Sequence, residues 1–247
     1  MNATGRLSGR GVVVTRPREL AEPFARLLEQ HGARAIVFPA LEIQPLPPPP
    51  TLGRIADFDL VVFVSPSAVR VTLAALPRRL TAAAIGAGTA RELERAGIGP
   101  VIAPVAGADS EALLALPQMH QLAGKRVLIV RGEGGRELLA QSLSERGARV
   151  EYAECYRRVR PRADPAALLA SWAAGGVHAV TVNSGEALDN LLALLGAEGA
   201  ARLRATPLFV PHARVAAQAA QLGVREALVA GAADSEMLER LVAYFKT

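Results

Sequence analysis

Residues that can bind an anion recur where the sequence passes from an apolar run into a helix-forming segment. They include arginine, whose planar guanidinium pairs with carboxylate or phosphate, and small or hydroxylic residues that let a ligand approach the backbone. The segments are Thr15-Arg16-Pro17, Ser65-Pro66-Ser67, Gly88-Thr89, Arg131-Gly132, Asn183-Ser184-Gly185 and Pro211-His212-Ala213-Arg214. Helix N-termini add free N–H groups and a partial positive charge, so the pattern predicts a site for a large anion. For any single residue, a helix cap or a turn is the alternative interpretation.

The same segments lack the motifs of several common enzyme classes. Residues 86–88 (GAG) begin like a dinucleotide fingerprint, but Arg91 stands where the third glycine belongs. Residues 124–126 (GKR) lack the upstream glycine and the hydroxylic residue of a phosphate loop. Ser65 and Ser184 precede helices, as a nucleophile would, yet neither lies in a G-x-S-x-G sequence. We therefore expect no nicotinamide cofactor, no phosphate loop and no serine triad.

The composition limits the classes of binding partner and the cellular compartment that we expect for this protein. Of the 247 residues, 51% are hydrophobic, which is enough for two cores, and residues 1–11 carry no apolar signal segment. No stretch approaches the roughly 18 apolar residues of a membrane span. The net charge of +5 comes from arginine, but without a basic run or many aromatic residues nucleic acid binding is disfavoured. The lone Cys155 excludes an intramolecular disulfide and argues against zinc, so we expect a cytoplasmic protein.

The elements that must position these residues are apolar strands alternating with amphipathic helices. Continuous Val, Ile and Leu runs indicate parallel strands covered on both faces. Helices are predicted between them, for example over 20–31 and 138–146. The predicted strands are 12–15, 35–38, 60–64, 82–85, 101–103, 126–130, 150–153, 179–182, 207–210 and 227–229. The sequence thus predicts an α/β protein with two doubly wound parallel sheets of five strands each.

The two halves of the chain repeat each other. Residues 12–17 (VVVTRP) recur as 127–132 (VLIVRG), an offset of 115, and a GAR turn follows both at that same offset. Residues 59–68 correspond to residues 178–187 at an offset of 119. A long unit present twice predicts a pseudo-two-fold pair of domains with a cleft. Because ligands of open α/β sheets bind beyond the carboxyl ends of the strands, the two domains are expected to surround one polyanion.

The strongest linker signals lie inside each copy of the repeat. Residues 45–50 (PLPPPP) predict a stiff polyproline segment, and 160–165 (RPRADP) are its counterpart. We therefore predict exchanged domains joined by a two-stranded linker. The division is a first domain of 1–44 with 166–247, a second domain of 52–159, and linkers at 45–51 and 160–165. A contiguous division with its boundary at 116–124 is the alternative.

Five segments are informative through their order along the chain. They are VVVTRP at 12–17, DLVVFVSPSAV at 59–69, AIGAGTARELERAG at 84–97, RVLIVRG at 126–132 and GARVEYAECYRR at 147–158. Together they resemble the uroporphyrinogen-III synthase family. The resemblance implies two α/β domains with a two-stranded connector, a substrate, hydroxymethylbilane, that is a linear tetrapyrrole with eight carboxylates, and no cofactor or metal. Members of this family remove the terminal hydroxyl as water and close the ring with inversion of ring D, which gives uroporphyrinogen III for haem biosynthesis.

The resemblance and the pattern at the strand ends assign roles to individual residues. Tyr156 matches the family's tyrosine and is predicted to assist departure of the hydroxyl as a proton or hydrogen-bond donor. A packing role for its ring is the alternative. The predicted substrate-binding residues are Arg16, Ser65, Ser67, Thr89, Arg131, Gly132, Ser184 and His212. His212 is included because the family often carries threonines where this chain reads VPHAR at 210–214.

A cytoplasmic binding or sensor module with two lobes, closing on a polycarboxylate without catalysis, is the alternative function. No motif in the chain requires catalysis, and the missing threonines at 210–214 favour this reading. Such a module would return its ligand unchanged. In either case we expect a monomer, because no long exposed apolar stripe requires a dimer.

Overall fold

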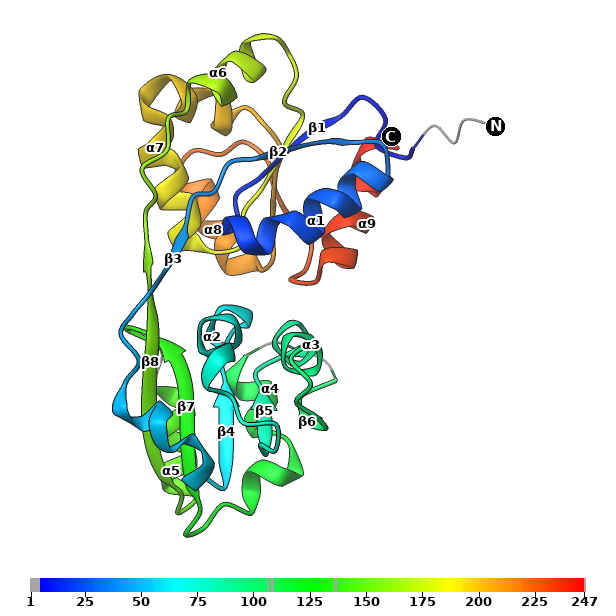
Figure 1. Ribbon diagram of the computed structural model, residues 1–247. Coiled ribbons are helices and arrows are strands. Elements are labelled where there is room, and N and C mark those ends of the chain that lie inside the picture. Colours follow the sequence, from blue (N-terminus) through cyan, green and yellow to red (C-terminus); the bar gives the residue numbers. More distant parts are fainter. Residues whose placement is uncertain (1–4, 106, 108, 136, 247) are drawn as a thin grey trace. The chain divides into compact units, whose positions relative to one another are not determined.

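The computed structural model describes residues 5–105, 107, 109–135 and 137–246, which group into two compact units (Figure 1). The terminal unit is formed by Met1–Glu42 with Val159–Thr247, and the central unit by Ile43–Arg158. Residues 1–4 and 247 of the predicted first domain lie outside the described residues. The predicted boundaries at 44, 52, 159 and 166 stay a prediction.

The terminal unit contains a five-stranded parallel sheet in the order β11-β10-β9-β1-β2. Its strands are β1 Gly11–Val14, β2 Arg34–Val37, β9 Ala179–Thr181, β10 Leu208–Val210 and β11 Ala227–Val229. Its helices are α1 Arg18–Gln30, α6 Ala166–Ala173, α7 Gly185–Arg204, α8 Ala213–Gln221 and α9 Asp234–Phe245. Val13 packs against α6, α7 and α8, whereas Val12 and Val14 pack against α1 and α9. Both faces are covered, which explains why the strands are continuous apolar runs.

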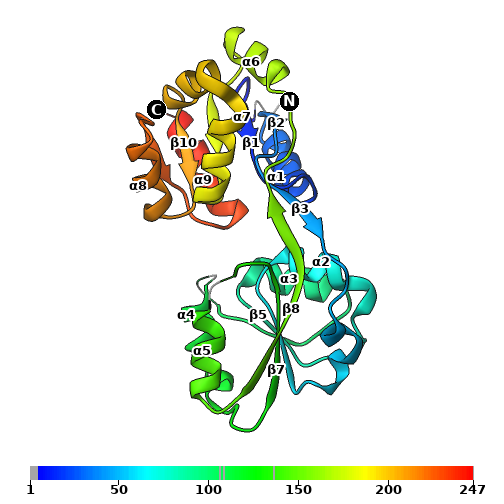
Figure 2. The ribbon, with the colours of Figure 1, turned by 90° about the vertical axis from the view of Figure 1, so that its left-hand side faces the viewer.

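The central unit contains a six-stranded sheet in the order β3-β8-β7-β4-β5-β6. Its strands are β3 Glu42–Pro45, β4 Leu60–Phe63, β5 Ala82–Ala84, β6 Val101–Ile102, β7 Arg126–Gly132 and β8 Arg149–Val159. Its helices are α2 Pro66–Thr72, α3 Ala87–Arg95, α4 Ser110–Leu114 and α5 Leu138–Glu145, with 3-10 turns η1 Pro50–Asp57, η2 Leu73–Ala75 and η3 Pro117–His120. Val61 packs with α2, α3 and η1, and Val62 packs with α4 and α5. Helices α4 and α5 lie together on one side of this sheet (Figure 2). Over the described ranges of both units, no helix is long and apolar enough to cross a membrane.

Each sheet takes strands from both halves of the sequence. β1 pairs with β9, and β4 pairs with β7. Each sheet therefore combines a strand–helix–strand segment from one copy of the repeat with strands from the other copy, three in the terminal sheet and four in the central sheet. The predicted α/β class with parallel sheets is confirmed, and all ten predicted strands form.

The prediction of five strands in each sheet is wrong for the central unit. An additional strand, β3, lies beside β8 at the edge of the central sheet. It ends at Pro45, the first residue of the segment that the sequence predicted to be polyproline. Proline has no N–H to donate, and an edge strand tolerates this because one of its sides needs no partner. Proline content alone therefore did not rule out a strand here.

Candidate active site

The predicted site residues lie at the carboxyl edges of the two sheets. In the central unit Ser65 caps α2 after β4, Ser67 lies in the first turn of α2, Thr89 lies in the first turn of α3 after β5, and Arg131 with Gly132 ends β7. In the terminal unit the residues that follow β1, β9 and β10 are Arg16, Ser184 and His212. Ser67 and Thr89 are buried, whereas His212 is exposed at the start of α8. Binding of substrate by these three residues stays a prediction.

Ser65 and Ser184 are helix caps in equivalent positions of the repeat. The Ser65 hydroxyl accepts a hydrogen bond from the Ala68 N–H at 3.0 Å, and the Ser184 hydroxyl accepts one from the Ala187 N–H at 3.1 Å. The capping interpretation of these serines is therefore confirmed. A hydroxyl that accepts at a cap still has its own proton to donate, so capping leaves room for a second role.

Tyr156 lies against Ser65 in the central unit. The two hydroxyl oxygens are 2.9 Å apart, and either can be the donor. The phenol ring also covers Gly132, because a Cβ atom at that position would lie 2.6 Å from Cε2 of Tyr156. Glycine is therefore required there for the close approach. Tyr156 as a whole is 3% exposed, so both its ring packing and its hydroxyl contact are fixed by the surrounding core.

An irregularity in β8 decides which face of the sheet Tyr156 occupies. Arg131 on β7 lies opposite Glu154, but the next residue, Gly132, lies opposite Tyr156. β8 thus accommodates one extra residue, Cys155, in a β-bulge. Cys155 and Tyr156 both pack into the core beneath α2 and α3, whereas strict alternation would put Tyr156 on the same face as Glu154. The bulge therefore turns the phenol toward the end of β4.

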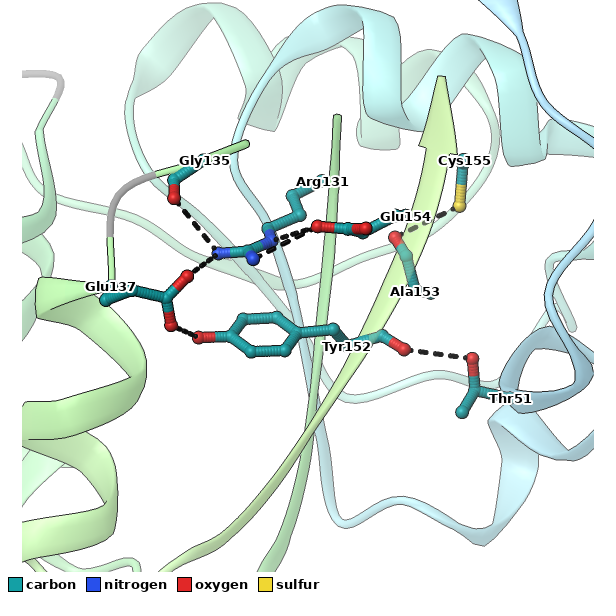
Figure 3. A network of polar contacts seen from close by, with 8 residues as sticks. All are labelled: Thr51, Arg131, Gly135, Glu137, Tyr152, Ala153, Glu154 and Cys155. Carbon is teal, nitrogen blue, oxygen red and sulfur yellow. Dashed lines mark hydrogen bonds and ion pairs between the residues drawn. The ribbon is translucent and has the colours of Figure 1, made fainter. Parts of the chain in front are cut away.

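The Arg131 side chain is held by a cluster of neighbours on the opposite face (Figure 3). Its Nη2 lies 3.0 Å from Oε1 of Glu154, and its Nη1 lies 2.9 Å from Oε1 of Glu137. Nη1 also donates to the Gly135 carbonyl at 3.3 Å, and Cζ lies 3.7 Å from the centroid of the Tyr152 ring. With the side chain only 8% exposed, two carboxylates and an aromatic face surround the guanidinium.

Tyr152 and Glu137 in this cluster have shifted pKa values. The Tyr152 hydroxyl donates to Oε2 of Glu137. Burial, reinforced by that hydrogen bond, raises the pKa of Tyr152 to about 12. The hydrogen bonds from Tyr152 and then from Arg131 lower the pKa of Glu137. At neutral pH the phenol is therefore protonated and the carboxylate charged, which suits the contacts that they make.

Arg16 is the counterpart of Arg131 in the terminal unit, 115 residues earlier. Its Nε donates to Oδ1 of Asn183 at 2.9 Å, and its Nη1 forms an ion pair with Asp234. Its Cζ lies 4.9 Å from the centroid of the Phe24 ring. Each strand-end arginine is thus paired with a carboxylate of its own unit, and binding of substrate by either stays a prediction.

The partners of these arginines were not identified from the sequence. One usable signal was present, because Tyr152 and Glu154 stand two residues apart on a strand and must share a face beside β7. No comparable signal existed for Glu137, which lies in the loop before α5. The bulge at Cys155 also had no signal in the sequence.

Comparisons with known proteins agree with this architecture. A family model described as Uroporphyrinogen-III synthase HemD matches residues 22–239. A uroporphyrinogen-III synthase of Escherichia coli strain K12 is 35% identical over 241 residues, covering 93% of this chain and 98% of the relative. One of Salmonella typhimurium strain LT2 is 35% identical over 244 residues, with the same 93% and 98% coverage.

A solved structure is similar over the same extent. The crystal structure of uroporphyrinogen-III synthetase from Helicobacter pylori 26695 matches with a TM-score of 0.62 and covers 95% of this chain and 99% of that one. The two sequences are 15% identical. At that identity the match bears on the fold, and it supports the two-domain α/β architecture.

Proposed function

The chain belongs to the uroporphyrinogen-III synthase family, and we propose that it cyclises hydroxymethylbilane to uroporphyrinogen III, with Tyr156 as its catalytic residue. The observation that carries this proposal is the contact between the Ser65 and Tyr156 hydroxyls at the carboxyl edge of the central sheet. That edge is where ligands of α/β sheets bind. The reaction is that of a lyase, because it eliminates water while it closes the ring.

In the first step the hydroxymethyl end of the bilane loses its oxygen. The C–O bond breaks with its electron pair on oxygen, and the Tyr156 hydroxyl supplies the proton or hydrogen bond that lets this oxygen leave as water. Ser65 accepts from the Ala68 N–H, and in the proposed step its own proton is donated to the phenol oxygen 2.9 Å away, which would stabilise negative charge there. The azafulvene that remains is attacked by the substituted carbon of ring D. Rearrangement of the spiro intermediate inverts that ring, and the proton released on closure returns to Tyr156.

The other part of the proposed function is control of the substrate's conformation. In water the bilane closes without inversion, so the protein must hold it folded for the other closure. We assign contacts with its carboxylates to residues predicted from the sequence, which are Arg16, Ser65, Ser67, Thr89, Gly132, Ser184 and His212. Arg131, the remaining residue of the predicted set, has its guanidinium paired with Glu137 and Glu154. The net charge of +5 supports binding of an acidic substrate.

The proposed setting follows from composition and from the family. We place the protein in the cytoplasm as a monomer that uses no cofactor or metal and binds no nucleic acid. Its exchanged domains are taken as 1–44 with 166–247 and as 52–159, with linkers at 45–51 and 160–165. Sedimentation of the purified chain as a monomer, with and without substrate, is the expected result.

Isomer analysis tests the proposed function. The purified protein is given freshly generated hydroxymethylbilane, the products are oxidised, and uroporphyrins I and III are resolved by chromatography. We expect mainly type III. Type I alone, formed at the rate without protein, would contradict the proposal and would favour a polycarboxylate-binding module without catalysis.

A further inference from the structure

The bulge that turns Tyr156 toward Ser65 lies directly beside the Arg131 cluster. Glu154 is the last residue of β8 in the regular register, and Cys155 is the inserted one. Arg131 lies opposite Glu154 and contacts its Oε1 through Nε at 3.1 Å and through Nη2 at 3.0 Å. Opposite charges that face each other across two strands stabilise the register in which they meet. This ion pair therefore fixes the last regular step of the ladder before the bulge.

Arg131 also holds the backbone that contacts Tyr156. Its Nη1 donates to the Gly135 carbonyl and pairs with Glu137, both in the loop that follows β7. In the same loop, the Glu133 N–H donates to the Tyr156 carbonyl at 2.8 Å. The guanidinium thus acts on both sides of the bulge. It pairs with Glu154, which precedes Cys155, and it holds the loop whose Glu133 N–H binds the carbonyl of Tyr156, which follows Cys155.

A shift of β8 by one residue would undo this arrangement. Without the bulge, Cys155 would lie opposite Gly132, and Tyr156 would turn to the face of Glu154, away from Ser65. Loss of the guanidinium would also leave the Glu137 and Glu154 carboxylates near each other without their shared cation, which disfavours the present register.

We propose that Arg131 is a positioning residue that keeps the β8 bulge in place and so holds the Tyr156 hydroxyl against Ser65. The inference rests on the proposed function, because it takes Tyr156 as the group that assists the chemistry, and it replaces the predicted role of Arg131 as a carboxylate ligand. The two roles differ in kinetics. Loss of a substrate ligand raises KM, whereas loss of a positioning residue lowers kcat with KM nearly unchanged.

The test is a double-mutant cycle between Arg131→Met and Tyr156→Phe, measured as kcat and KM for formation of type III product. Arg131→Met is expected to lower kcat about 10-fold to 100-fold, since a distant change that misplaces a group by about 1 Å costs on the order of 100-fold. In the Tyr156→Phe background the same substitution is expected to lower kcat less than twofold further, because the group that it positions is already gone.

Arg126→Met is the matched control. Arg126 begins the same strand, lies 3.7 Å from a β8 carboxylate, Glu151, and has its Cζ 4.9 Å from the centroid of the Phe58 ring. It lies at the amino end of β7, away from the bulge, so its loss is expected to leave kcat within twofold of the wild type. If Arg131→Met does not fold, Arg131→Lys and Glu154→Gln enter the same cycle, because each weakens the contact between Arg131 and Glu154 with a smaller change in volume.

Two results would overturn the inference while leaving the proposed function intact. One is a rise in KM with kcat preserved, which would make Arg131 a substrate ligand. The other is a fall in kcat for Arg131→Met that is as large in the Tyr156→Phe background as in the wild type. A wild-type protein that yields only type I product would instead contradict the proposed function itself, and the inference would fall with it.

Discussion

The terminal and central units are built from the same repeat, yet among the described residues only the central unit places a phenol beside its strand-end serine. Ser65 and Ser184 cap α2 and α7 in the same way, each accepting from the N–H three residues on. At the offset of 115, the position of Tyr156 is occupied in the terminal unit by Leu41. The terminal unit therefore has the cap without the phenol. The repeated fold provides a place at the sheet edge, and individual side chains decide what chemistry is done there.

The largest expected effect comes from removing the hydroxyl that distinguishes the two units. Tyr156→Phe keeps the ring over Gly132 but removes the proposed proton or hydrogen-bond donor. We expect kcat to fall by about 100-fold to 10,000-fold, the range typical of general acid catalysis, with little change in the free energy of unfolding. Tyr244→Phe, which removes a phenol hydroxyl bonded to Glu226 in the terminal unit, is the control and is expected to retain full activity. Equal rates for the two variants would mean that the Tyr156 hydroxyl is not needed for catalysis.

The next effect concerns the space that the phenol occupies. The terminal unit has Pro17 where the central unit has Gly132. At the position of Tyr156 it has Leu41, whose side chain has no phenol ring to lie over Pro17. Gly132→Ala would bring a Cβ atom to within 2.6 Å of the Tyr156 ring. We expect it to lower the free energy of unfolding by about 1–3 kcal/mol, as overpacking does, and to reduce kcat as the ring moves. Denaturant unfolding and steady-state rates measure both effects.

Gly53→Ala is the control for that substitution. A Cβ atom at Gly53 would meet nothing within 4 Å, and this residue lies in a 3-10 turn rather than at the sheet edge. Wild-type stability and activity are expected. A Gly132→Ala protein as stable and active as the Gly53→Ala protein would show that the close approach of ring and backbone is unnecessary.

The smallest expected effect is a pH dependence that belongs to the terminal unit. The Gly11 N–H donates to Nδ1 of His178 at 3.0 Å, which requires that nitrogen to be unprotonated. Burial, and then the charges of Arg10 and Arg34, lower the pKa of His178 below its ordinary value of 6.5. Below that pH the unfolded chain binds the proton more readily than the folded chain, so stability decreases as the pH falls through 6.5.

His178→Gln isolates this contribution. The glutamine amide oxygen can still accept from the Gly11 N–H, but it does not titrate. Free energies of unfolding at about pH 7.5 and about pH 5.5 should differ less for this variant than for the wild type. An identical decrease in both proteins would mean that His178 makes no contribution to acid sensitivity.

The sequence predicted the layers of this fold better than its local irregularities. Ten strands were predictable because strands buried on both faces are continuous apolar runs. β3 was missed because Pro45 indicated a linker, although proline is tolerated at a sheet edge. The positions of Ser65 and Ser184 at strand ends followed from the order of apolar runs and helices.

The contacts of the site were less predictable than its location. The bulge at Cys155 changes the face of Tyr156, and one inserted residue leaves no periodic signal in an eleven-residue strand. A basic residue at a strand end suggested a ligand for an acidic substrate, but such a residue pairs equally well with acids of its own fold. The two carboxylates around Arg131 come from a loop and from a neighbouring strand, and no sequence spacing relates all three residues.

Ser65 and Ser184 share a structural role as helix caps, whereas in the proposed mechanism only Ser65 takes part in catalysis. The direct measurement compares Ser65→Ala with Ser184→Ala in one steady-state assay, together with their free energies of unfolding. Both variants should lose about 1 kcal/mol of stability, because both lose a helix cap. Ser65→Ala should lower kcat by about tenfold through the lost partner of Tyr156, whereas Ser184→Ala should retain kcat and raise KM. An equal fall in kcat for both variants, or none for Ser65→Ala, would contradict a catalytic role that belongs to Ser65 alone.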